Sequence, residues 1–327
     1  MRALITLFTG ILLFTNAPVL SQQLEGTLVV VNKSDNSVSL IDINSATIVN
    51  TLPTGQGPHE IVVTRDGLWA ISTDFVGGNS LTVFDLKAQK VARTIQLKEY
   101  PGPHGIRILK NQKEVAFTSG RSKHLVIANF HTGEITQAIP TNQDTTHMVA
   151  IADSQEFAYT TNIRSNTISK LNLSDGFITK QISTELMPEA INITKDGSEI
   201  WYGANREGLV TVFSNTQKVL AQFNGFSFPY RVLFSHKEQK ALVPDFNNHY
   251  LRFFDRETKL ELGTLNFEKQ AGPQGITLHP KLDIAFVSLN LKNKVVAIDI
   301  KSRTIIKEFP TGNNPDGVGY SSLKLTP

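Results

Sequence analysis

Three features of the sequence predict an all-β fold, namely a seven-bladed β-propeller with four antiparallel strands in each blade. One unit recurs seven times along the 327 residues, with 41 to 45 residues between successive copies. Within each unit, apolar side chains return with a period of two, which is typical of strands. No sustained helical period follows the first residues of the chain. Four strands repeated at this spacing are typical of propeller blades.

The first strand of each unit follows a short motif that appears first as Gly57-Pro58-His59. With this first copy included, the seven copies are Pro58-His59, Pro103-His104, Thr146-His147, Pro188-Glu189, Pro229-Tyr230, Pro273-Gln274 and Pro315-Asp316. The five residues after each copy, such as EIVVT and GIRIL, carry apolar side chains at their second and fourth positions. Because proline fixes φ and glycine accepts unusual backbone angles, the motif predicts a tight entry into the strand.

The other three strands of each unit follow in order. Asp-Gly pairs such as Asp66-Gly67 predict a hairpin turn after the first strand. The second strand reads WAIST, FAYTT or IAFVS in different copies, and the fourth reads TIVNTL, VARTIQL or TIIKEF. A turn-forming residue ends the third strand in every copy: Asp42, Asp85, Asn129, Asn172, Ser214, Asp255 and Asp299.

The two ends of the chain predict how the ring closes. Three strands, at about 27–31, 37–41 and 46–52, precede Pro58, whereas one strand follows Pro315. Three strands and one strand together make a seventh blade, with the C-terminal strand innermost. The sequence contains no cysteine, so this closure is non-covalent. Disulfides, Cys-ligated zinc, iron–sulfur clusters and covalently attached haem are likewise excluded.

The first 21 residues predict a secretory signal peptide. Arg2 supplies a positive charge, a short apolar run follows from Ala3 to Phe14, and small residues precede a cleavage point after Ser21. We therefore expect residues 22–327 to form a single propeller domain that is exported, either to a periplasm or outside the cell, without a membrane span. The formal net charge is +3 and no dense Lys/Arg block occurs, so the sequence predicts no nucleic-acid partner.

The residue after each motif proline is expected to lie where an innermost strand begins, so seven such residues should surround one mouth of the central channel. The predicted ring is His59, His104, His147, Glu189, Tyr230, Gln274 and Asp316. Arg107 and Asn192 are polar residues in otherwise apolar inner strands, and either could hold an anionic ligand or make ordinary hydrogen bonds. Arg231 could instead pair with a neighbouring carboxylate.

The segments GPHEIVVTRDG, GPHGIRIL, FAYTTN and NSVSLIDINSATIVNTLPTGQGP resemble the YVTN-repeat seven-bladed propellers, including the YncE-like exported proteins. The resemblance extends over residues 22–327, although TTHM replaces Gly-Pro-His-Gly in the third copy. It implies the propeller fold but no single activity, since the wider superfamily includes binding proteins, lactonases, streptogramin lyases and redox subunits.

The sequence therefore predicts a monomeric binding protein that uses the channel mouth for a small molecule, a cell-envelope component or a partner protein. One alternative is a metal-dependent lactonase or lyase in which His59, His104, His147 and Glu189 hold a divalent ion, since imidazole and carboxylate are the expected ligands. Repetition of an ancestral Gly-Pro-His unit would explain the same histidines without a metal. A second alternative is a redox propeller that binds d1-type haem or copper non-covalently.

Overall fold

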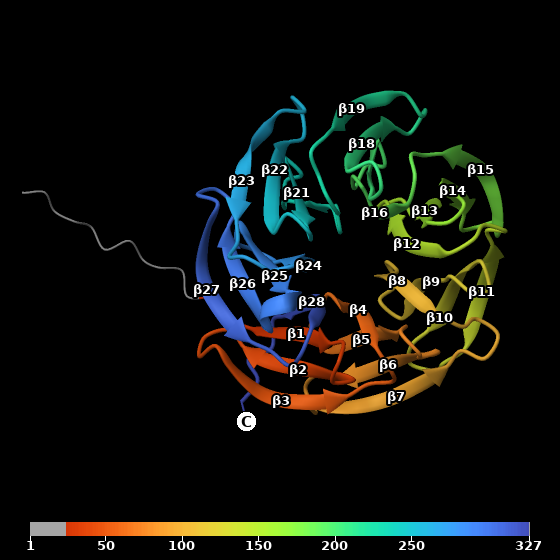
Figure 1. Cartoon of the computed structure of the whole chain (residues 1–327). Helices are drawn as coiled ribbons and strands as arrows, with labels where there is room; N and C mark the ends of the chain where they lie inside the picture. The colour runs from red at the N-terminus through yellow and green to blue at the C-terminus, as the bar shows by residue number, and fades with distance from the viewer. Residues whose placement is uncertain (1–23, 327) are drawn as a thin grey trace, which may run out of the picture.

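The computed structural model describes residues 24–326, which form seven four-stranded antiparallel sheets arranged as blades around a central axis (Figure 1). The predicted all-β propeller is confirmed. The only helix in residues 24–326 is a single 3-10 turn, η1 (Asn290–Lys292). We number the blades by their innermost strands, so that blade 1 begins at β4 and blade 7 contains the first and the last strands of the described residues.

Within each blade, the strands are given in order from the innermost, next to the axis, to the outermost. Blade 1 contains β4 (Pro58–Val63), β5 (Trp69–Asp74), β6 (Ser80–Asp85) and β7 (Lys90–Gln96). Blade 2 contains β8 (Pro103–Ile108), β9 (Glu114–Ser119), β10 (His124–Asn129) and β11 (Ile135–Pro140). Blade 3 contains β12 (Thr146–Ile151), β13 (Phe157–Asn162), β14 (Thr167–Asn172) and β15 (Phe177–Ser183).

The remaining blades follow the same order. Blade 4 contains β16 (Pro188–Ile193), β17 (Glu199–Ala204), β18 (Leu209–Ser214) and β19 (Val219–Phe223). Blade 5 contains β20 (Leu233–Phe234), β21 (Lys240–Asp245), β22 (Tyr250–Asp255) and β23 (Glu261–Asn266). Blade 6 contains β24 (Pro273–Leu278), β25 (Ile284–Leu289), β26 (Lys294–Asp299) and β27 (Thr304–Pro310).

Blade 7 closes the ring as predicted. The C-terminal strand β28 (Pro315–Ser321) is innermost, and β1 (Thr27–Asn32), β2 (Ser37–Asp42) and β3 (Thr47–Pro53) lie outside it. The register pairs Leu28 with Tyr320 and Val30 with Val318. The side chain of Thr27 also donates to the carbonyl of Leu323. Strands β1 and β28 are therefore held together by ladder hydrogen bonds and by this side-chain bond.

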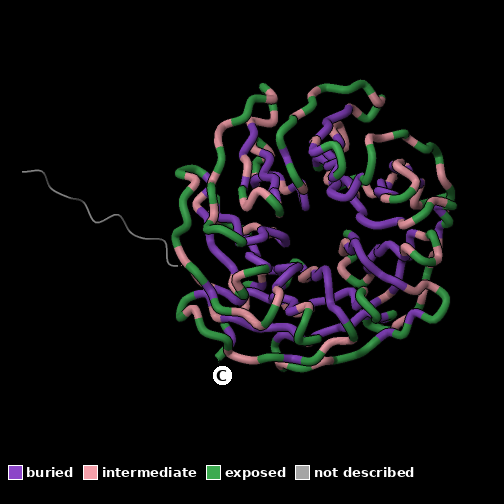
Figure 2. Tube along the Cα trace, viewed as in Figure 1, coloured by how far each residue is buried: buried purple, intermediate pink, exposed green. Residues whose placement is uncertain are grey.

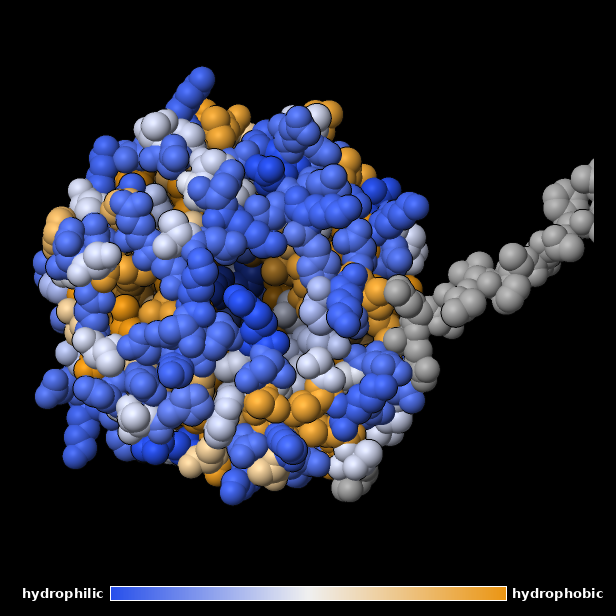
Figure 3. Space-filling view, turned by 180° about the vertical axis from the view of Figure 1, so that it is seen from behind, coloured by the Kyte–Doolittle hydropathy of each residue, from blue (hydrophilic) through white to orange (hydrophobic). Residues whose placement is uncertain are grey.

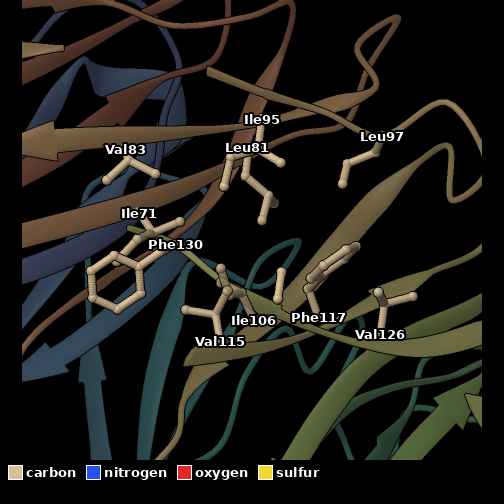
Figure 4. Close-up of a cluster of buried hydrophobic side chains, with 11 residues drawn as sticks. Ile71, Leu81, Val83, Ile95, Leu97, Ile106, Val115, Phe117, Val126 and Phe130 are labelled. Atoms are coloured by element: carbon tan, nitrogen blue, oxygen red, sulfur yellow. The ribbon is translucent and has the colours of Figure 1, made fainter. Parts of the chain in front are cut away.

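The core lies between the blades, because each sheet has two apolar faces and each face packs against a neighbour. One cluster joins Ile71 and Leu81 of blade 1 to Ile106 and Phe117 of blade 2 (Figure 4). Burying each such side chain contributes about 1.5–3 kcal/mol. The outermost strands are mostly exposed, and the inner strands are mostly buried (Figure 2). Each blade thus depends on both neighbours.

A register shift marks the start of most inner strands. Pro58 pairs with Asp74, but Ile61 pairs with Ser72, so one extra residue is accommodated between them. The inner strands of blades 2, 3, 4 and 6 show an irregularity at the same place. Bulges of this kind re-aim side chains. His59 and Glu60 both lie within the irregularity, which interrupts the strict alternation expected of the strand.

Blade 5 departs from the predicted strand pattern, because its inner strand is reduced to Leu233–Phe234 and one bridge between Pro229 and Asp245. The carbonyl of Pro244 accepts from the amide of Tyr230, so Pro244 faces the inner strand, where a proline has no N–H to donate. The carboxylate of Asp245 accepts from the amides of Ser227 and Phe228. These bonds hold Ser227 and Phe228, which precede the inner strand, in a loop.

No helix within residues 24–326 is long and apolar enough to cross a membrane. The predicted signal peptide, residues 1–21, lies outside the described residues, and its cleavage remains a prediction.

Candidate functional site

Six of the seven predicted ring residues lie at the start of inner strands, and Tyr230 follows the isolated bridge at Pro229, but all seven are buried rather than placed around an open mouth. Their exposed fractions lie between 0% and 8%. They are His59, His104, His147, Glu189, Tyr230, Gln274 and Asp316. Their polar groups must therefore find partners inside the protein.

Three imidazole rings from neighbouring blades form what we call the histidine stack. The rings of His104 and His147 are parallel within 26°, with centroids 3.5 Å apart, and the centroid of His59 lies 4.2 Å from that of His104. Phe75, just after β5, approaches all three rings, at centroid distances of 5.5, 4.7 and 6.1 Å for His59, His104 and His147. Burial lowers the pKa of His59 and of His104 well below the ordinary value, so both rings are neutral at neutral pH.

The histidine stack ends at a carboxylate that is shared by several groups. Asp316, on the closing strand β28, lies 2.6 Å from Lys33 Nζ and 3.1 Å from His59 Nδ1. Lys33 also lies 3.1 Å from His59 Nε2, to which its ammonium group donates. The hydroxyl of Tyr230 donates to Asp316 at 3.3 Å. Burial, with Asp316 close by, raises the pKa of Tyr230 well above its usual value, so this hydroxyl keeps its proton.

A second ion pair crosses the axis between blades 1 and 5. The guanidinium of Arg231 donates to Glu60 Oε1 and to the carbonyl of its neighbour Tyr230. Burial opposes the charge on Arg231, but Glu60 and the other nearby acids outweigh it and raise the pKa of the guanidinium. The sequence predicted a neighbouring loop carboxylate as one partner for Arg231, whereas Glu60 lies in the inner strand β4. Glu60 itself was missed, because a strictly alternating strand does not bring residues 59 and 60 to one site.

The predicted four-residue metal set does not converge as a whole. His147 Nε2 lies 3.7 Å from Glu189 Oε1, and Glu189 accepts a hydrogen bond from Asn205. Within the described part of the chain, the group whose potential ligand atoms all lie within 4.8 Å of one another is His59, Glu60 and His104. Two of the four predicted ligands thus belong to this group, and Glu60 is its third member.

An axial cavity of about 460 Å³ begins at Glu60 and Arg231 and continues along the inner strands. Residues from all seven blades line it, and the turn at Arg65 and the segment at Ser322 lie at its far end. Figure 3 shows hydrophilic residues around a hollow at the centre of the ring. The open part of the channel therefore lies beside the buried ring residues, towards the other ends of the inner strands.

Arg107 and Asn192 both line this cavity, although their hydrogen bonds differ. Asn192 donates to the carbonyl of Val232 and accepts from the amide of Ile193, so its amide is used within the fold. Arg107 makes a single hydrogen bond among the described residues, to the carbonyl of Ile106, and no ion pair. Burial, together with the charge of Arg231, lowers the pKa of Arg107, while Glu60 acts in the opposite direction.

Comparisons with known proteins agree with this architecture. Residues 21–114 match the model of the YncE-like β-propeller family. The search of curated proteins returned no match. Among solved structures, a functionally unknown protein from Desulfotomaculum acetoxidans superposes with a TM-score of 0.76 at 14% identity, over 90% of this chain and 99% of that one.

Hydrazine synthase from Kuenenia stuttgartiensis superposes with a TM-score of 0.70, also at 14% identity, over 81% of this chain and 90% of that one. At these identities the likeness concerns the fold alone. The resemblance expected from the sequence is confirmed by the family match and by the seven blades. The chain is a seven-bladed β-propeller, and its residues 21–114 are similar to the YncE-like β-propeller family.

Proposed function

We propose that this protein is an exported binding protein that takes a small organic anion into the axial cavity. The observation that carries the proposal is Arg107, whose guanidinium lies on the cavity wall without an acidic partner among residues 24–326. A guanidinium presents a planar fork of donors that matches a carboxylate or phosphate. The volume of about 460 Å³ lies within the range of small-molecule sites.

The other groups at the cavity wall support a carboxylate ligand. Arg231 stands at the inner end of the cavity, and its Nε is buried without a hydrogen-bond partner. Ile61, Met148 and Val232 supply apolar wall from blades 1, 3 and 5. A ligand with one carboxylate and a short apolar body would pair its charge with Arg107 and bury the rest. Glu60, at the same end, disfavours a second negative charge placed beside it.

Arg107→Gln tests this proposal directly. We expect aliphatic and aromatic monocarboxylates to raise the melting temperature of the wild-type protein, and neutral amides of the same size to leave it unchanged. The variant should lose at least about tenfold in affinity, because charged hydrogen bonds contribute about 1.5–3 kcal/mol each. Thermal shift and titration calorimetry measure both effects, with inorganic phosphate as a second anion.

The matched control is Arg206→Gln, since Arg206 is an exposed arginine that does not line the cavity. It should bind the same carboxylates as the wild type does. Equal stabilisation by the neutral amides, or undiminished carboxylate binding by Arg107→Gln, contradicts the proposal.

A further inference from the structure

We propose that His59, Glu60 and His104 form a binding site for a single Zn²⁺ ion, separate from the anion-binding role of Arg107. The site lies at the inner end of the axial cavity, beside the histidine stack. The repeated motif places His59 and His104 at the start of their inner strands. The register shift between Pro58 and Ile61 brings the carboxylate of Glu60 to the same place.

The first observation is the environment of His104. Its side chain is buried, with an exposed fraction of 1%, and neither Nδ1 nor Nε2 has a hydrogen-bond partner. A buried polar group without a partner destabilises the folded state, so native structures usually provide one. Stacking on His147 and the edge contact with Phe75 satisfy neither nitrogen. A bound cation would use one of them.

The second observation is that suitable ligands converge. Ligand atoms of His59, Glu60 and His104 all lie within 4.8 Å of one another. On His59, the nitrogen on the side of Glu60 is Nδ1, 3.6 Å from Oε1. Because Lys33 donates to Nε2, the neutral ring carries its proton on Nδ1. Zinc binding at Nδ1 therefore moves that proton to Nε2, and Lys33 then keeps only its ion pair with Asp316. Two imidazoles and one carboxylate are a known three-ligand set for zinc, with a fourth position open to water or a ligand. No cysteine is present to favour softer metals.

The third observation is the support behind these ligands. The hydroxyl of Thr73 donates to the backbone carbonyl of His104 and accepts from the backbone amide of Glu60. One side chain therefore fixes the two ligand-bearing strands, β4 and β8, relative to each other. Such outer contacts orient metal ligands and contribute to affinity.

Two acids and two bases surround the site. Asp316 lies 3.1 Å from His59 Nδ1 and is paired with Lys33, while Glu60 is paired with Arg231, so these four groups together are neutral before an ion binds. Arg231 donates to Glu60 Oε1, and the other carboxylate oxygen, Oε2, makes no hydrogen bond among the described residues. Glu60 also lines the axial cavity, so an ion can approach from that side.

The test uses the full protein after export, purified without an affinity tag and freed of metal with a chelator. Calorimetric titration with ZnCl₂ should show one equivalent bound. His104→Gln and Glu60→Gln should each weaken binding at least about tenfold. His131→Gln is the matched control, because His131 is an exposed histidine in blade 2, and it should bind zinc as the wild type does.

Circular dichroism establishes that each variant is folded before it is titrated. If neither ligand variant folds, the visible spectrum of Co²⁺ bound to the wild type decides: four- or five-coordinate cobalt supports the site, and the spectrum of hydrated cobalt overturns it. Absence of stoichiometric zinc, or unchanged binding in both ligand variants, also overturns it. Arg107→Gln should keep the zinc, which separates this proposal from the anion site.

Discussion

Single residues at the end of the second strand show how the chain handles buried polar groups. Asp74 ends β5, and it accepts hydrogen bonds from the hydroxyls of Ser80 at 2.6 Å and Thr82 at 2.8 Å. At the equivalent position of blade 7, Asn32 donates its amide to two serine hydroxyls. Hydroxyls can donate or accept, so the same pocket accommodates an acid or an amide.

Asp74 provides a prediction about pH and stability. Burial raises the pKa of its carboxyl to about 6, although its hydroxyl partners act in the opposite direction. The folded state thus holds the proton more tightly than the unfolded state. Stability is lost as the pH rises from about 4 to about 6, by roughly 3 kcal/mol. Asp74→Asn should therefore unfold at higher urea concentration than the wild type at pH 7, and at a similar concentration at pH 4.

Asp245→Asn is the informative comparison, because Asp245 ends β21 at the same position but accepts from the backbone amides of Ser227 and Phe228. Those donors cannot rotate as hydroxyls do, so this variant should lose stability at pH 7. If the wild type unfolds at a higher urea concentration than Asp74→Asn does at pH 7, the raised pKa of Asp74 does not reduce stability and the prediction is wrong.

Among the elements, the inner strands determine how closely the site residues approach one another. In blades 2, 6 and 7 a glycine follows the ring residue: Gly105, Gly275 and Gly317. A Cβ on Gly105 would lie 2.7 Å from the Cα of Met148 on the neighbouring strand. The absence of a side chain lets adjacent inner strands approach, and this allows imidazoles from neighbouring blades to stack.

The closing strand β28 is the element whose loss we expect to be most damaging. Deletion of residues 316–327 removes the inner strand of blade 7 and the packing of Val318 against Leu28 and Phe286. The truncated chain should show no cooperative thermal transition. A synthetic peptide of residues 316–327, added in trans, should restore that transition, because it supplies the missing ladder partner of β1. Calorimetry with and without the peptide measures this, and an unchanged melting temperature in the truncated chain contradicts it.

On the scale of the whole molecule, the sequence was enough to predict the number of blades, their strand order and the closure, because these follow from one repeated pattern with period two. The shortened inner strand of blade 5 was not predicted, since it depends on how Pro244 faces its neighbour. Glu60 was not predicted as a site residue, because a register shift is not visible in a run such as EIVVT. Lys33 was also missed, since it comes from a loop of blade 7 rather than from the repeated motif.

Export is a prediction about the whole chain. Expressed in a Gram-negative bacterium, the protein should be recovered from the periplasm with Gln22 as its first residue. Leu12→Arg interrupts the apolar run and should leave the full-length chain in the cytoplasm. Mass spectrometry of the two fractions measures both outcomes. A wild-type chain that keeps residues 1–21 would contradict the assignment.

The position of Asp316 on the last strand has a consequence during synthesis. A ribosome completes six blades and three strands of the seventh before it adds the carboxylate that faces Lys33 and His59. A chain released early, or trimmed by a protease before residue 316, would thus lack the pairing of β28 with β1. It would also lack the carboxylate that contacts Lys33 and His59. Quality control and ligand capture would then depend on the same closing strand, β28.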